Sequence, residues 1–189
     1  AYAHHIPIIS TNTEEFLQDF CLTHKIESII EIGGAIWYSA LAFADSMRKY
    51  SSEYRILSRE ISYPHYYQFL YHTRDNSSIR WYLGDFLSYN KQTYLSQEKD
   101  YDLIFIDARK SETLDYIKNL ANIVDTTTYI IVDDAIKFKN KMENLYTFLD
   151  KHSICYAVKH LDEDDGILVI PVTQYLLQIL SSQSDPANH

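Results

Sequence analysis

Short β-rich runs alternate with longer segments of helical periodicity along most of this 189-residue chain. This alternation constrains the fold strongly, because parallel strands need a long crossover between them and a helix usually supplies it. The expected helices begin near Thr13, Tyr38, Tyr63, Thr113 and Lys141. The expected strands are 28–32, 54–61, 79–83, 101–106, 128–132, 154–160 and 167–172. The pattern predicts an α/β protein with seven strands.

The direction of the last strands follows from the length of their connection. Only the acidic turn LDEDDG separates the final two runs, which is too short for a helical crossover, so we expect them to be antiparallel. The run YDLIFI is apolar throughout, as expected for a strand covered by helices on both faces. The prediction is a doubly wound, mostly parallel sheet with an antiparallel last strand and helices on both faces.

Length and composition limit the function. We expect one domain over residues 1–181, followed by a mobile tail at 182–189. No apolar run reaches the roughly 18 residues that cross a bilayer, and two cysteines without a CxxC exclude a cysteine-based zinc site. We therefore predict a cytoplasmic protein without a membrane partner.

Charge argues against a general nucleic-acid binder. The chain carries a net charge of −9, whereas affinity for nucleic acid comes largely from basic side chains that neutralise phosphates. Lys137, Lys139 and Lys141 form a short basic cluster, which we interpret as a solvated loop. Nucleic acid is therefore not an expected partner.

A glycine turn follows the first expected strand in the segment EIGGAIWYS. Gly33 and Gly34 stand between this strand and the next helix, at the edge where open α/β sheets bind ligands. The N-terminus of a helix offers free N–H groups that suit a carboxylate or phosphate. A tight turn without any ligand remains an alternative interpretation.

Acidic residues end or follow the next two strands. Glu60 ends the second strand, where a carboxylate can accept hydrogen bonds from ribose hydroxyls. The alternative is a surface glutamate beside Arg59. Gly84 and Asp85 follow the third strand and carry a similarly modest signal.

Three carboxylates end the fourth and fifth strands. Asp107 follows one apolar run, and Asp133 and Asp134 follow the other. These strands should be neighbours, so the carboxylates should converge and raise one another's pKa unless a hard divalent cation binds them. The alternatives are N-capping of helices by Asp107 and Asp134, or pairing with Arg109 and Lys110.

Taken in order, six segments resemble motifs of the class I S-adenosylmethionine-dependent methyltransferases. More narrowly, they are similar to the cation-dependent O-methyltransferase family of the caffeoyl-CoA and catechol type, and YDLIFIDARK is the most specific match. The resemblance implies a Rossmann-like fold. The six segments are IIEIGGAIWYSALAFA, LSREIS, LGDF, YDLIFIDARK, YIIVDDA and DEDDGILVI.

The resemblance implies a place for each matching residue around the cofactor S-adenosylmethionine. Glu31, Gly33 and Ser39 would line the methionine end, Glu60 would hold the ribose, and Asp85 and Phe86 would border the adenine. Gly34, Trp37 and Asp107 are the other residues expected to bind the cofactor.

The resemblance also implies a metal and a reaction. Asp107, Asp133 and Asp134 would hold Mg²⁺, Mn²⁺ or Ca²⁺, and Asp107 and Lys110 would be catalytic, with Lys110 beside the reacting hydroxyl. A cation chelated by two substrate oxygens lowers the pKa of the attacking hydroxyl, which then takes the methyl group in line. Lys110 would assist deprotonation or stabilise the oxyanion. The implied substrate is a small, catechol-like molecule, and the implied assembly is a homodimer.

Three departures from the family pattern leave other functions open. Trp37 stands at the second motif glycine, Asp134 replaces an asparagine, and DTTTYIIV lacks the usual glycine pair. An indole that points into the turn would obstruct the cofactor, whereas one that points into the core would not. The alternatives are a methyltransferase-fold binding or assembly protein without catalysis, and methylation of a modified RNA base.

Overall fold

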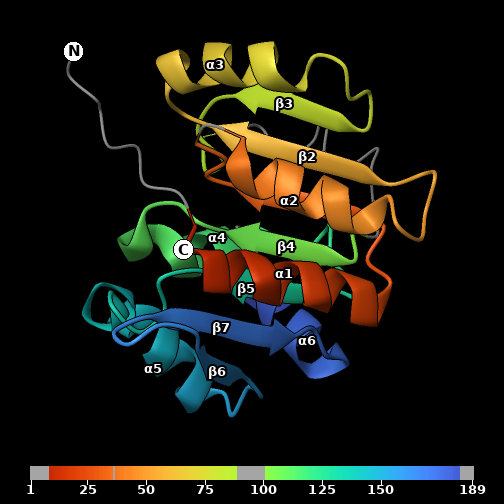
Figure 1. Cartoon of the computed structure of the whole chain (residues 1–189). Coiled ribbons are helices and arrows are strands. Elements are labelled where there is room, and N and C mark those ends of the chain that lie inside the picture. Colours follow the sequence, from red (N-terminus) through yellow and green to blue (C-terminus); the bar gives the residue numbers. More distant parts are fainter. Residues whose placement is uncertain (1–8, 36, 89–100, 184–189) are drawn as a thin grey trace.

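Figure 1 shows the computed structural model of the chain, which describes residues 9–35, 37–88 and 101–183. Seven strands form one sheet in the order β3-β2-β1-β4-β5-β7-β6. Strands β1 to β5 are parallel to one another, and β7 is antiparallel to both β5 and β6. The predicted fold class and the antiparallel last strand are confirmed. The strands are β1 Ser28–Ile32, β2 Arg55–Glu60, β3 Ile79–Leu83, β4 Leu103–Ile106, β5 Tyr129–Val132, β6 Ala157–His160 and β7 Gly166–Pro171.

Helices cover both faces of the sheet, as predicted. The apolar core on one face includes side chains from α1, α2 and α3, and the core on the other face includes side chains from α4, α5 and α6. In Figure 1, α1 and α2 lie in front of the sheet. The helices are α1 Thr11–His24, α2 Tyr38–Met47, α3 Tyr63–Thr73, α4 Thr113–Lys118, α5 Glu143–Lys151 and α6 Gln174–Gln183, with short 3₁₀ helices η2 Lys110–Glu112 and η3 Lys139–Met142.

The apolar strands contribute side chains to the cores on both faces of the sheet. Ile29 of β1 belongs to the core under α1 to α3, and its neighbour Ile30 belongs to the core under α4 to α6, because successive side chains of a strand point to opposite faces. Both side chains are fully buried, which stabilises the fold by roughly 1.5–3 kcal/mol each. This two-sided burial explains why the strand sequences are apolar runs rather than alternating ones.

Helix α4 is shorter than its sequence pattern suggests. We expected it to reach Ile123, but it ends at Lys118. The side-chain amide of Asn119 donates to the backbone oxygen of Asp115 at 2.6 Å. Such a local side-chain bond competes with continuation of the helix.

No helix was predicted from the sequence after the last strand, where α6 lies, and a mobile tail was expected from residue 182. The helix continues to Gln183, and residues 184–189 lie outside the described residues. Thr173 Oγ1 accepts from the backbone N–H of Leu176 at 3.2 Å, which caps the helix start, and Leu176 and Leu180 are buried one turn apart. This threonine followed by leucines four apart is the signal that could have revealed α6.

The start of α1 is attached to the acidic turn between β6 and β7. Ser10 Oγ donates to Asp162 Oδ2 at 2.6 Å, and the Asn12 side-chain amide donates to Asp162 Oδ1 at 2.6 Å. Ser10 also accepts from the backbone N–H of Thr13, so it caps α1 at the same time. One aspartate of the last hairpin therefore helps to hold the first helix.

The order of the strands reverses direction between β1 and β4. The chain leaves β1 toward β2 on one side and later enters β4 on the other. The carboxyl ends of these parallel strands lie together at the left of Figure 1. Ligands of open α/β sheets bind at such a switch point.

Candidate active site

A cavity of about 190 Å³ lies at this edge, between the segments that follow β1, β2, β3 and β4. Five predicted cofactor residues line it: Gly33, Glu60, Asp85, Phe86 and Asp107. The other four, Glu31, Gly34, Trp37 and Ser39, are not part of its lining. The predicted residues at the strand ends thus surround the cavity, while several side chains of the first turn lie outside its lining.

Gly33 allows the first turn to approach the neighbouring strand closely. Its φ of 94° lies in the region that favours glycine, and a Cβ at this position would lie only 2.1 Å from the backbone oxygen of Asp107. The N–H groups of Gly33 and Gly34 donate to the backbone oxygen of Arg59 at 2.9 and 3.0 Å. The turn is thereby fixed against the end of β2.

Glu60 organises the loops around the cavity. Its Oε2 accepts from the backbone N–H of Ala35 at 2.8 Å, and its Oε1 accepts from that of Ser62 at 2.6 Å. His65 Nδ1 lies 3.8 Å from Oε1. Glu60 is buried but still lines the cavity, so its remaining lone pairs can face a ligand. The alternative of a surface glutamate is therefore wrong.

Glu31 lies behind the turn rather than in the cavity wall. Its side chain is fully buried and accepts hydrogen bonds from the hydroxyls of Ser39 and Ser58. Burial raises the pKa of Glu31 to about 7, against the two serine bonds, which lower it. Glu31 thus joins β1, β2 and the start of α2.

Trp37 also points away from the cavity. It precedes α2 with a φ of 99°, a conformation that favours glycine, the residue that the family pattern has at this position. Its indole stacks on the ring of His72 in α3 and packs against the core on the α1–α3 face. The backbone keeps a glycine-like conformation, and the large side chain is accommodated outside the turn.

Asp85 and Phe86 shape the cavity next to β3. Asp85 caps its own turn by accepting from the backbone N–H of Leu87 and the hydroxyl of Ser88, both at 3.0 Å. Phe86 is buried and meets Tyr116 of α4 edge to face, with ring centroids 6.0 Å apart. Together they give this end of the cavity one acidic and one aromatic wall.

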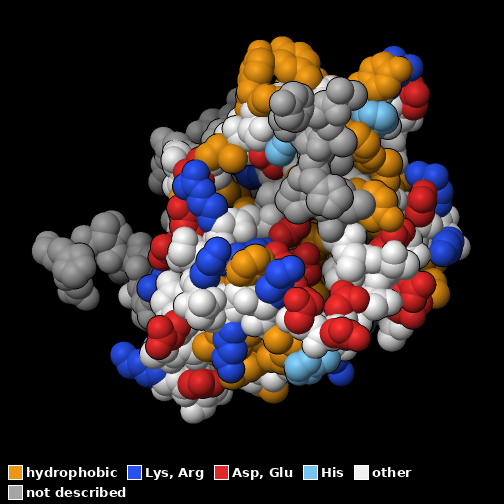
Figure 2. Space-filling model, turned by 60° about the vertical axis from the view of Figure 1, so that its left-hand side comes forward, with side chains coloured by type: hydrophobic (Ala, Val, Ile, Leu, Met, Phe, Trp, Pro, Cys, Tyr) orange, Lys and Arg blue, Asp and Glu red, His pale blue; other side chains and the backbone are white. Residues whose placement is uncertain are grey.

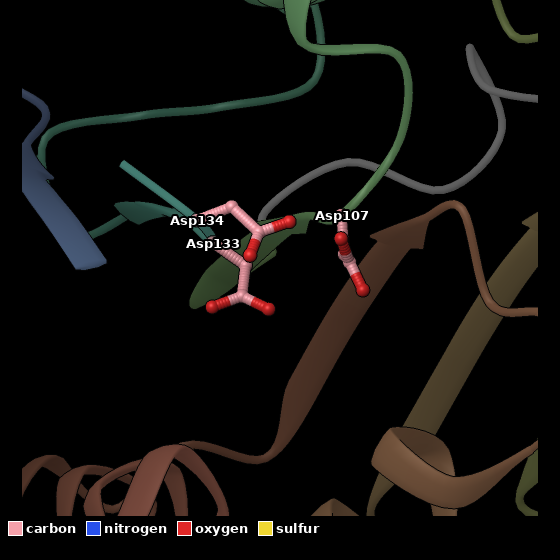
Figure 3. A group of neighbouring side chains, drawn as sticks. All are labelled: Asp107, Asp133 and Asp134. Atoms are coloured by element: carbon pink, nitrogen blue, oxygen red, sulfur yellow. The ribbon is translucent and has the colours of Figure 1, made fainter. Parts of the chain in front are cut away.

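The three predicted carboxylates meet where β4 and β5 end. Figure 3 shows Asp107, Asp133 and Asp134 side by side, and one oxygen from each lies within 4.8 Å of the others. The strand pairing continues to the cluster, because Asp133 N–H donates to the backbone oxygen of Ile106 at 3.0 Å. Asp134 adopts a left-handed φ of 56°. The prediction that these carboxylates converge is confirmed.

Lys110 lies inside the carboxylate cluster. Its Nζ is 2.8 Å from Asp107 Oδ1 and 2.9 Å from Asp134 Oδ2, and it donates to the backbone oxygen of Asp133 at 3.3 Å. Burial lowers the pKa of Lys110, but Asp107 and Asp134 raise it by more, so the net shift is upward. Pairing with Lys110 is therefore present, whereas Arg109 pairs with Glu112 instead. The N-capping interpretation is wrong, because neither aspartate is the N-cap of the helix that follows it.

One ammonium does not fully neutralise three carboxylates. Burial and then the charge of Asp107 raise the pKa of Asp133 to about 7, despite Lys110. The pKa of Asp134 is lowered, because Lys110 and a hydrogen bond from Asp165 outweigh its burial. Several carboxylate oxygens at this spacing are the donor set that Mg²⁺, Mn²⁺ and Ca²⁺ prefer, so the residues present fit such a cation.

Several cavity residues were not predicted as site residues, and two of them come from α-helices. His65 of α3 and Tyr116 of α4 line the cavity. Both belong to helices whose sequence shows only ordinary helical spacing, so no local signal distinguishes them. Their place depends on how α3 and α4 pack beside the strand ends.

The fold and site define a class of protein, the Rossmann-like methyltransferases. The glycine turn after β1, the acid at the end of β2 and the reversed strand β7 next to β5 all belong to this arrangement. The sequence profile of the O-methyltransferase family matches residues 2–174, and this chain belongs to that family of methyl-transferring enzymes. Among the described residues, no helix is long and apolar enough to span a bilayer.

Solved structures of other methyltransferases have the same fold. The O-methyltransferase from Bacillus cereus in complex with SAH is 21% identical, with 90% of this chain and 86% of that chain covered and a TM-score of 0.73. The SAH-bound methyltransferase from Podospora anserina is 17% identical and has a TM-score of 0.75. The match covers 88% of this chain and 80% of that chain. The O-methyltransferase TomG from Streptomyces achromogenes in complex with SAM is 14% identical and has a TM-score of 0.73. The match covers 88% of this chain and 82% of that chain.

Proposed function

We propose that this chain transfers a methyl group from S-adenosylmethionine to a hydroxyl of a small, catechol-like substrate, assisted by a divalent cation. The observation that carries the proposal is that Asp107 belongs both to the cavity lining and to the carboxylate cluster. A methyl donor in the cavity would therefore lie beside the groups that can hold an acceptor oxygen through a cation. The SAM or SAH bound to similar proteins supports the choice of cofactor.

The cavity residues suit the parts of this cofactor. Glu60, which lines the cavity, would accept hydrogen bonds from ribose hydroxyls, and Asp85 and Phe86 would border the adenine. Gly33 leaves room for the methionine end to approach the backbone. We propose that Glu31 does not contact the cofactor and that its hydrogen bond with Ser39 stabilises the conformation of the first turn.

The carboxylate cluster suits the acceptor side of the reaction. Asp107, Asp133 and Asp134 would hold the cation, which, when bound, lowers the pKa of a coordinated hydroxyl. Lys110 donates to Asp107 and Asp134, which supports a role in orienting both carboxylates, and its positive charge would stabilise the substrate oxyanion. The chain's own contribution is orientation and electrostatics, as an in-line methyl transfer requires.

The remaining predictions concern organisation. We propose a single domain, extended from the expected boundary at residue 181 to the end of α6 at Gln183, a homodimer as the assembly and a cytoplasmic location. An inactive binding protein is less well supported than an enzyme, because the main argument for it was an indole in the cofactor turn, and Trp37 packs outside the cavity. The net charge of −9 continues to argue against RNA as the substrate.

Calorimetry and methylation assays test the proposal. We expect S-adenosylmethionine and its product to bind, catechol to be methylated in the presence of Mn²⁺, and a chelator to abolish turnover. Asp107→Ala should lose activity and Mn²⁺ binding, whereas Asp115→Ala, at an exposed position of α4, should retain both. Absence of cofactor binding at millimolar concentration would refute the proposal, and full activity in a chelator would refute the role of the metal.

A further inference from the structure

Three lysines lie on the segment that leads away from the carboxylate cluster. Lys137, Lys139 and Lys141 are exposed and follow Asp134 within seven residues. In the part of the chain that the structure describes, none of the three forms an ion pair with a carboxylate within 4.0 Å. No described carboxylate thus holds these lysines in a close ion pair, although the charge of Lys137 acts on the nearby Asp134 and the chain as a whole carries a net charge of −9.

Aromatic rings position these lysines. The ammonium groups of Lys137 and Lys141 lie 5.8 and 4.6 Å from the centre of the Phe138 ring, and that of Lys139 lies 5.0 Å from the centre of the Tyr146 ring. Such cation–π contacts hold an ammonium near a surface without cancelling its charge. The lysines are thus partly ordered and remain available to an anion.

A second cavity opens among these residues. It has a volume of about 570 Å³ and is lined by Ile136, Lys137, Lys139, Asn140, Glu143 and Tyr146. Ile136 and Tyr146 give it apolar and aromatic surface, and Glu143 is the one acidic side chain of the lining. The cavity can therefore receive a ring that carries a negative charge.

This second cavity is linked directly to the carboxylate cluster. The Tyr146 hydroxyl donates to the backbone oxygen of Ala135, the residue after Asp134, at 2.8 Å. The 3₁₀ helix η3, which carries Lys139 and Lys141, contacts η2, which begins with Lys110. Figure 2 looks toward the edge where the parallel strands end, and basic side chains lie there next to acidic ones.

The two cavities are formed by different segments beside the cluster. The first cavity follows β1, β2, β3 and β4, the carboxylates follow β4 and β5, and the lysine-lined cavity lies in the segment after β5. Methyl transfer needs a donor on one side of the reacting oxygen and the body of the acceptor on the other. The lysine-lined cavity, which is formed by the segment that follows Asp133 and Asp134, is the candidate for the acceptor side.

We propose that this cavity is an acceptor subsite that selects hydroxylated aromatic substrates bearing an anionic group, such as a carboxylate. The inference rests on the proposed function, because it takes the carboxylate cluster as the place of the reacting hydroxyl. The acceptor's ring packs on Ile136 and Tyr146, and its anionic group reaches the ammonium groups of Lys137 and Lys139. Lys141 adds to the positive field at the rim.

Two probes that differ in one charge test the subsite. Protocatechuate carries a carboxylate, and its methyl ester is neutral with the same catechol ring. Calorimetry should show that the wild-type chain binds protocatechuate about tenfold more tightly than the ester, because three partly exposed charges act together. The variant K137Q/K139Q/K141Q should bind both probes equally, and added salt should reduce the wild-type preference.

A matched control carries the same change in net charge. In K49Q/K151Q/K159Q, three exposed lysines elsewhere are replaced, and the tenfold preference should persist. Equal binding of the two probes by the wild type, binding of neither, or loss of the preference in the control would overturn the subsite. The titrations are run with and without SAH, so the subsite is tested even if the cofactor does not bind. Selective binding of protocatechuate without any methylation would leave the subsite standing and count against the proposed function.

Discussion

The indole of Trp37 stacks on the imidazole of His72 with ring centroids 3.8 Å apart and an angle of 24° between the ring planes. This contact joins the residue that precedes α2 to the last turn of α3. It accounts for how a tryptophan occupies a glycine-like backbone conformation without entering the cofactor cavity. The contact and the strained backbone have opposite effects on stability, and two substitutions separate them.

Trp37→Ala should lower the free energy of unfolding by about 2 kcal/mol, because alanine loses the indole packing but keeps the unfavourable φ. Trp37→Gly should recover about 1 kcal/mol of that loss by relieving the backbone strain. Urea denaturation of the two variants gives both quantities. The affinity for SAH should change less than about twofold in either variant. A gain of tenfold or more in Trp37→Gly would show that the indole obstructs the cavity after all.

Glu31 should make stability depend on pH near neutrality. Burial raises its pKa from the ordinary 4.5 to about 7, so the folded state holds this proton more tightly than the unfolded state does. Its contribution to stability is full below about pH 4.5 and is lost as the pH rises through about 7. The stability of the wild type relative to Glu31→Gln should therefore fall by up to about 3 kcal/mol over that range. Urea denaturation at several pH values measures this, and a flat difference would contradict a neutral, buried Glu31.

Lys110→Met should uncover the repulsion among the three aspartates. Without divalent cations at neutral pH, the variant should lose about 2 kcal/mol of unfolding free energy, because Asp107 and Asp134, which are partly buried, lose their counter-charge. Mn²⁺ should raise its melting temperature far more than that of the wild type, since the cation replaces the missing charge. Lys151→Met, at an exposed position at the end of α5, is the control and should behave as wild type. Equal responses of Lys110→Met and wild type to Mn²⁺ would contradict a cation site at Asp107, Asp133 and Asp134.

Gly34→Ala should test how tightly the first turn packs on Glu31. A Cβ at Gly34 would lie 2.1 Å from Ser58 Oγ, 2.8 Å from the Trp81 ring and 2.9 Å from Glu31 Oε2. Overpacking of this kind should cost about 2 kcal/mol or more and disturb the buried serine–glutamate bonds. Gly84→Ala is a useful comparison, because Gly84 has a φ of 145° but open space around its Cβ position, so it reports backbone strain alone. A smaller loss in Gly34→Ala than in Gly84→Ala would contradict the close packing.

The strand ends were the most predictable part of the site. Asp107, Asp133 and Asp134 each follow an apolar run, and neighbouring parallel strands necessarily bring such residues to one edge. Glu60 was placed in the same way, from its position at the end of β2. These predictions needed only the order of the strands and no knowledge of side-chain packing.

Side-chain direction within the first turn could not be predicted. The sequence places Glu31 and Trp37 in a cofactor motif, but whether they face the cavity depends on the φ values of the turn and on partners distant in sequence. Ser58 turns Glu31 inward from β2, and His72 holds Trp37 outward from α3. The cavity residues His65 and Tyr116 were missed for the same reason, because helix packing rather than local sequence brings them there.

The bonds from Ser10 and Asn12 to Asp162 have a consequence for biosynthesis. They span 152 and 150 positions of the chain, so the start of α1 gains this support only after the segment that carries Asp162 has left the ribosome. The same acidic turn carries Asp165, which accepts a bond from the backbone N–H of Lys137. The hairpin of β6 and β7 thus supports both α1 and the segment beside the carboxylates once it is synthesised. A nascent chain that stalls before Asp162 would lack both.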